Sequence, residues 1–290
     1  MKILELAAPA FLLLIGLEWW LARRRGRAVF ATRDTMANLA MGLGNRVLEL
    51  GWVVVELAVL GWLHQHSALD LGTGPAAWVV AIVGLDLAYY AYHRAHHEVR
   101  LLWASHVVHH SSRRYNLAVA LRQPWLVFTT LPFLAPLAVL GVRPELIAVS
   151  WAVNLLYQFW IHTELIDRLP RWFEATFNTP SHHRVHHGRN PQYLDRNYAG
   201  VLIVWDRWFG TFEPEVERVT YGLTKDITTH NPFRIATHEL AAIGRDVRAA
   251  TTWSERLGRV FRGPGWQPAG SPAASHPPAT ADAVAEWSPA

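Results

Sequence analysis

The chain has 290 residues, of which 51% are hydrophobic and only 17% are charged. Soluble domains usually carry about 25% charged residues, so this composition favours a membrane protein. There is no cysteine and there are 16 histidines, which excludes disulfides and leaves imidazole, carboxylate or water as metal ligands. The formal net charge of +4 could suit nucleic acid. However, the arginines adjoin apolar segments instead of lining one face among aromatic residues, so we expect no nucleic-acid partner.

Five apolar segments predict an all-α integral membrane protein with about four to five membrane helices, because about 20 apolar residues cross a bilayer. These segments are residues 3–22, 38–62, 77–92, 125–142 and 145–161. A secretory signal peptide is the alternative for the first segment. Basic residues follow its apolar core, however, and it shows no small-residue cleavage site. Pro132 and Pro136 interrupt the fourth segment and predict a kink or a re-entrant hairpin.

The connecting segments predict the orientation in the membrane. Residues 23–37 carry five arginines, whereas residues 64–75 carry no lysine or arginine. Positive segments stay in the cytoplasm, so the histidine-rich runs at 93–110 and 182–187 are expected on that side, in a helical cap. The membrane would be a bacterial inner membrane or one of the endoplasmic reticulum type, with the active site facing the cytoplasm.

Three regions are expected along the chain. Residues 1–70 supply N-terminal membrane helices, residues 77–245 form a histidine-rich domain, and residues 246–290 form a C-terminal extension. The extension is rich in proline, alanine and serine from about residue 263, a composition that cannot bury a core, so we expect disorder there. His276 lies in that tail and is assigned no role.

Three histidine runs, "HRAHH", "HVVHH" and "HRVHH", predict a metal site. Residues at i, i+3 and i+4 share one helix face, so each run can direct its imidazoles to one place. Eight imidazoles are too many for one ion and suit two ions that each keep an open position. The predicted ligands are His93, His97, His106, His109, His110, His183, His186 and His187.

Further residues near these runs are candidates for the same site. His96 and His182 are neighbours of the ligands but break their spacing, and both are kept as possible ligands. His162 ends the last apolar segment, where an unpartnered histidine is costly, so it is another candidate ligand. Glu98 and Asp195, with Glu164, could orient ligand imidazoles through hydrogen bonds. "HEVR" is no zinc-protease H-E-x-x-H motif, because Leu101 stands at its last position.

With these runs in place, the chain resembles the fatty acid hydroxylase superfamily, also called the sterol desaturase family. The signature of that family is H-x-x-x-H, H-x-x-H-H and H-x-x-H-H on a membrane scaffold. Within the family, the chain is most similar to alkylglycerol monooxygenase-like members, through stretches such as "NLLYQFWIHTELIDRLP" that span residues 86–224. The resemblance implies two iron ions, held by the eight histidines, that use O₂ to hydroxylate or desaturate a lipid C–H bond.

The resemblance also implies a membrane lipid substrate, with alkylglycerol cleavage as one reaction, and tetrahydrobiopterin as reductant. A ferredoxin or a cytochrome b5-like protein is an alternative electron donor. Zinc could replace iron in a structure, because imidazole sites accept it. One other reading is a fatty acid, sterol or carotenoid hydroxylase or desaturase. A second is a membrane metal-binding or transport protein without oxygen chemistry, which would place acids and histidines near mid-membrane instead of on one side.

Overall fold

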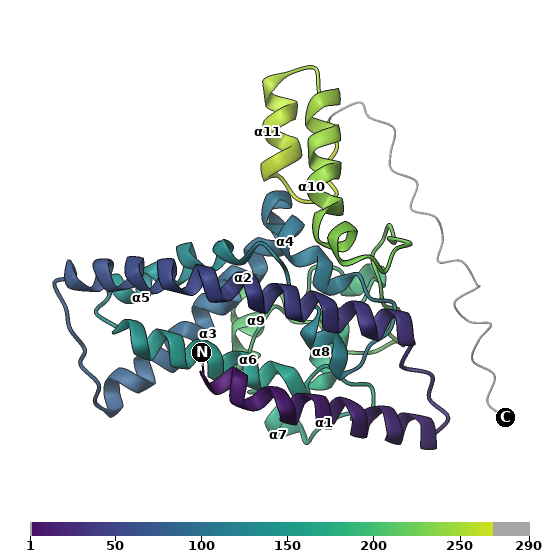
Figure 1. Ribbon diagram of the computed structural model, residues 1–290, viewed down its shortest axis with the longest axis horizontal. Helices are drawn as coiled ribbons and strands as arrows, with labels where there is room; N and C mark the ends of the chain where they lie inside the picture. The colour runs from purple at the N-terminus through teal and green to yellow at the C-terminus, as the bar shows by residue number, and fades with distance from the viewer. Residues whose placement is uncertain (1, 269–290) are drawn as a thin grey trace.

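The computed structural model describes residues 2–268, and these residues confirm the expected all-α class (Figure 1). The helices are α1 Lys2–Arg24, α2 Thr32–Gln65, α3 Pro75–Glu98, α4 Arg100–His110, η1 Leu117–Leu121, η2 Val127–Thr130, α5 Leu131–Val139, α6 Pro144–Trp160, α7 Arg171–Glu174, α8 Pro180–His186, η3 Pro191–Tyr193, α9 Val204–Phe209, α10 Pro232–Ala249 and α11 Trp253–Phe261. The described part contains no strand, only an isolated β-bridge between Phe177 and Leu202. Most of the expected tail, with His276, lies outside the described residues.

Three helices are long and apolar enough to cross a membrane: Leu4–Arg24 within α1, and the whole of α2 and α3. They correspond to the first three predicted segments. With 34 residues, α2 is about 51 Å long and exceeds the roughly 30 Å hydrocarbon layer. Its first turns serve a different purpose, since Ala37 and Met41 pack against Val107 of α4 in one buried cluster.

The fourth and fifth predicted segments form shorter helices than expected. α5 has nine residues and is about 14 Å long, and α6 has 17 residues and is about 26 Å long, so neither reaches about 30 Å alone. Pro132 in the first turn and Pro136 in the interior limit α5, as expected for residues without a backbone N–H. The prediction of four to five membrane helices therefore stays a prediction beyond the first three.

The turn between α5 and α6 lies beside the loop that joins α2 to α3. The carbonyl of Gly141 accepts a hydrogen bond from the Leu71 N–H at 2.9 Å, and Arg143 pairs with Asp70 at 2.8 Å. Gly141 has φ of +87°, and a Cβ there would lie 2.7 Å from the Leu69 carbonyl oxygen, so only glycine fits this turn. α3 and α6 therefore both start at this end of the molecule and run toward the histidine runs.

One buried carboxylate ties α3 to the loop that follows the third histidine run. Asp86 is 2% exposed, and it accepts hydrogen bonds from the backbone N–H groups of Val201 and Leu202 and from the side chains of Trp205 and Asn154. Carboxylates inside an apolar segment are costly unless they are fully bonded. Asp86 meets that condition and so fixes the cap on α3.

Candidate metal centre

The three histidine runs lie at the ends of three helices that meet in the cap. His93 and His97 occupy the last turns of α3, the second run ends α4, and the third run occupies α8 and its C-terminal residue. α4 begins directly after α3, at Arg100, so the chain turns and brings the second run back over the first. Thr179 holds the N-cap position of α8, but its hydroxyl bonds to Glu174 and does not cap the helix.

Nine buried histidines form two groups whose candidate ligand atoms lie within 4.8 Å of one another. The first group consists of His93, His97, His106, His110 and His186. The second consists of His109, His162, His183 and His187. The structure thus brings together the eight predicted ligands of the three runs and the further candidate His162, which follows α6.

Each H-x-x-H-H run contributes to both groups. His109 and His110 are consecutive on α4 but belong to different groups, as do His186 and His187, because consecutive helical residues point about 100° apart. The two groups are in contact, since the rings of His110 and His187 stack with centroids 4.5 Å apart. This is the arrangement expected for two neighbouring ions.

The hydrogen bonds of the outer ring nitrogens show that the inner nitrogens are bare. His162 Nδ1 lies 2.7 Å from the Gln158 carbonyl oxygen, and His109 Nδ1 lies 3.2 Å from the Arg122 carbonyl oxygen. A carbonyl only accepts, so each Nδ1 carries the hydrogen and each Nε2 presents a lone pair. Two Nε2 lone pairs 3.2 Å apart fit a bound cation.

The first group repeats this pattern. His93 Nδ1 faces the Tyr198 carbonyl oxygen at 2.7 Å, and His186 Nδ1 faces the Arg196 carbonyl oxygen at 2.9 Å. The Nε2 atoms of His97 and His186 are buried without a partner among the described residues. Buried polar atoms are nearly always satisfied, so these unpartnered nitrogens also fit a bound metal.

Burial keeps the histidines of α4 and α8 neutral, as metal ligands must be. It lowers the pKa of His106, His109 and His110 well below the ordinary value, because a charged imidazole loses its hydration there. The pKa of each histidine of the third run falls well below its ordinary value for the same reason. Burial lowers the pKa of His162 to about 4.

The other candidates from the sequence lie outside the two groups. His96 bonds to the Tyr92 carbonyl oxygen, and His182 lies edge-on to Phe212. Glu98 pairs with Arg94 at 2.7 Å on the surface. Asp195 alone approaches a ligand candidate, with its Oδ1 3.4 Å from His97 Nδ1.

The residue pattern did not indicate the side chains that hold in place the backbone carbonyls facing the histidines. Arg122 is 1% exposed and bonds to the Val108 carbonyl and the Asn38 side chain, which fixes the carbonyl that faces His109. Asp206 accepts hydrogen bonds from the N–H groups of Tyr198 and Ala199 and so fixes the carbonyl that faces His93. Asp86 could have been found, because an acid in an apolar segment is itself a signal.

Comparison with known proteins agrees with this geometry. A sequence model of the fatty acid hydroxylase family matches residues 78–211, a range that contains all nine histidines of the two groups. Residues 78–211 are therefore similar to the fatty acid hydroxylase family. No solved structure matches the chain significantly.

Curated relatives extend the similarity beyond these residues. Alkylglycerol monooxygenase of Homo sapiens is 42% identical over 268 residues, which cover 90% of this chain and 59% of the relative. Alkylglycerol monooxygenase of Danio rerio is 42% identical over 92% of this chain and 60% of its own length. Ornithine lipid hydroxylase OlsE of Rhizobium tropici is 28% identical over 56% of this chain and 50% of the relative. The chain spans about three-fifths of the length of the alkylglycerol monooxygenases.

Proposed function

We propose that the chain is a membrane-bound, non-haem di-iron oxygenase that uses O₂ to hydroxylate a lipid C–H bond, and that its substrate is an alkylglycerol ether lipid. Two adjoining all-histidine groups carry this proposal. They lie in a chain that is 42% identical to an alkylglycerol monooxygenase over 268 residues. Hydroxylation of the carbon next to an ether oxygen gives a hemiacetal, which breaks into an aldehyde and an alcohol, so this reaction would cleave the ether.

The nine histidines would hold the two ions, and His96 and His182 would hold none because they lie outside both groups. The bound irons would activate O₂ for insertion into the C–H bond, and zinc could take their place in a preparation. Asp195 would accept a hydrogen bond from His97 Nδ1 and so fix the orientation of that ring. Glu98 would take no part, since it pairs with Arg94.

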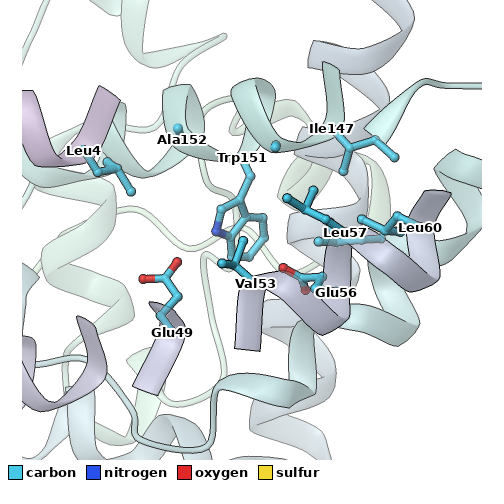
Figure 2. A pocket seen from close by; sticks show the side chains of 11 residues that line it. Leu4, Glu49, Val53, Glu56, Leu57, Leu60, Ile147, Trp151 and Ala152 are labelled. Carbon is cyan, nitrogen blue, oxygen red and sulfur yellow. The ribbon is translucent and has the colours of Figure 1, made fainter. Parts of the chain in front are cut away.

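A small, mainly apolar crevice among the membrane helices fits the choice of a lipid substrate. It lies between α1, α2, α5 and α6, its open volume is about 30 Å³, and Glu49 and Glu56 also contribute to its lining. Figure 2 shows the indole of Trp151 in the middle of the lining, between Leu4 on one side and Leu57 on the other. The ring of Trp151 lies 5.7 Å from that of Tyr89, which lies 5.4 Å from that of His93. An alkyl tail would have to widen this crevice to reach toward the first histidine group.

We propose that the cap faces the cytoplasm, on the side of the arginine-rich residues 23–33. In this arrangement the turn between α5 and α6 would lie at the outer face, beside the loop between α2 and α3, so η2 with α5 would lead outward through the membrane and α6 would lead back. Hydroxylation with O₂ needs an external electron donor. Tetrahydrobiopterin is the donor that the resemblance favours, and a ferredoxin or cytochrome b5-like protein is the alternative.

The test is anaerobic loading of the purified protein with ferrous iron, followed by O₂ and one of three lipids, with and without tetrahydrobiopterin. Alkylglycerol should yield a fatty aldehyde, whereas product only from fatty acyl or isoprenoid lipids would move the assignment to another lipid hydroxylase. His187→Ala should lose product and iron, while His182→Ala serves as the matched control. Full metal content and full activity in His187→Ala would refute the proposal, and iron binding without O₂ consumption would favour a metal carrier.

A further inference from the structure

The last helix of the described chain exposes a row of large apolar side chains. Trp253, Leu257 and Phe261 are 74%, 55% and 57% exposed, and their spacing of four residues places them on one face of α11. A neighbouring face, about 100° around the helix from Leu257, is packed, because a Cβ on Gly258 would lie 2.6 Å from the Trp266 ring. α11 therefore has one closed face and one open apolar face, and open apolar faces mark contact surfaces.

One cationic side chain borders this apolar face, and two lie elsewhere around the helix. The Arg256 guanidinium lies over the Trp253 ring at 5.0 Å from its centroid, whereas Arg259 and Arg262 lie near the Trp266 ring. The acidic residue of α11, Glu255, is engaged at the helix start by Thr251 and Thr252. An apolar face bordered by arginine is typical of helices that lie in the interface of an anionic bilayer.

The position of α11 agrees with such a contact. The Arg100 N–H, two residues beyond the end of α3, donates to the Arg262 carbonyl at 3.0 Å. The Arg100 guanidinium, 9% exposed, pairs with Glu239 and Asp246 of α10, each at 2.7 Å. The hairpin of α10 and α11 is thus clamped where a candidate membrane helix ends. Figure 1 shows this hairpin running across the direction of α1 and α2, with α11 on the side nearer to α5.

We propose that α11 lies on the surface of the bilayer that the chain itself crosses, with Trp253, Leu257 and Phe261 inserted at the boundary of headgroups and acyl chains. Arg256, at the border of this face, binds the phosphates of anionic lipids. A second copy of the chain fits less well, because a symmetric contact would bring identical arginines together. This contact depends on the membrane helices and not on the oxidation chemistry. It places the bilayer surface beside Val99, next to the histidines that end α3.

The absence of cysteine makes a site-directed label a clean test. Leu257→Cys is labelled with an environment-sensitive fluorophore, and Ala241→Cys, on an exposed position of α10, is the matched control. Phe261→Cys gives a second position on the same face if the first variant folds poorly. The labelled full chains are placed in vesicles of phosphatidylcholine with or without phosphatidylglycerol, and quenching by brominated lipid is compared with quenching by aqueous iodide.

Brominated lipid should quench the fluorescence of the label at position 257 and iodide should not, because interfacial helices insert about 5–10 Å into the bilayer. The label at position 241 should show the reverse. Quenching at position 257 should weaken without phosphatidylglycerol or at high salt. Iodide access at position 257 would overturn the proposal. A label shielded from both quenchers would indicate a protein contact instead, and equal quenching in neutral vesicles would overturn the role of anionic lipid.

Discussion

Replacing Asp86 by alanine tests how the cap is held on the membrane helices. Four donors point at this carboxylate: Val201 N at 2.9 Å, Leu202 N at 3.0 Å, Trp205 Nε1 at 2.9 Å and Asn154 Nδ2 at 2.7 Å. A buried donor without a partner costs about 1–3 kcal/mol. Water can enter the space left by the carboxylate, so we expect a cost of about 1 kcal/mol for each donor and a loss of about 4 kcal/mol in the free energy of unfolding.

Thermal unfolding in detergent measures this loss, and about 4 kcal/mol corresponds to a fall of roughly 8–16 °C in Tm for a chain of this size. Asp86→Asn should fall between wild type and Asp86→Ala, because its Oδ1 can still accept from Val201 N. The loop that Asp86 holds also carries the Tyr198 carbonyl that faces His93, so iron content should fall together with Tm. If Asp86→Ala unfolded within a degree or two of wild type, this account of the cap would be wrong.

Three further predictions concern the metal centre. Elemental analysis of His162→Ala should find about one of two metal ions lost, whereas His182→Ala should keep both. Equal metal content in the two variants would contradict the assignment of His162, and not His182, to a metal group. Asp195→Ala should weaken metal binding about 10-fold, the low end for such partners, since Asp195 is 66% exposed; an unchanged affinity would remove its role. Burial lowers the His162 pKa from 6.5 to about 4. Between these two pH values the unfolded apoprotein binds more protons than the folded one, so the free energy of unfolding should fall as pH drops from 6.5 to 4. A free energy of unfolding that stays constant over this pH range would refute this.

The parts of the molecule that follow from local pattern were predicted from the sequence. Three apolar segments became α1, α2 and α3, because length and apolarity are enough to specify a helix that crosses a membrane. The three histidine runs came together, since each lies on a helix and the i, i+3, i+4 spacing selects a face.

The remainder depends on contacts between distant parts of the chain. The place of His162 at the end of an apolar segment made it a candidate ligand, but no spacing rule assigns it to the group of His109 and His183. The division of each H-x-x-H-H run between two groups also depends on the positions of three helices at once. Arg122 and Asp206 act through backbone carbonyls, which leave no mark in the residue pattern. α5 is short because two prolines outweigh an apolar composition that resembled a full span.

The shortness of α8 has a consequence for how metal enters the protein. A helix of seven residues is unstable on its own, yet it carries His183 and His186 to different groups. An ion that binds either group would order this helix and with it the ligands of the neighbouring group, so the first ion should raise affinity for the second. Half-loaded molecules would then be scarce. In a cell short of iron, the population would divide into empty and fully loaded molecules, and activity would follow iron supply more steeply than a single site allows.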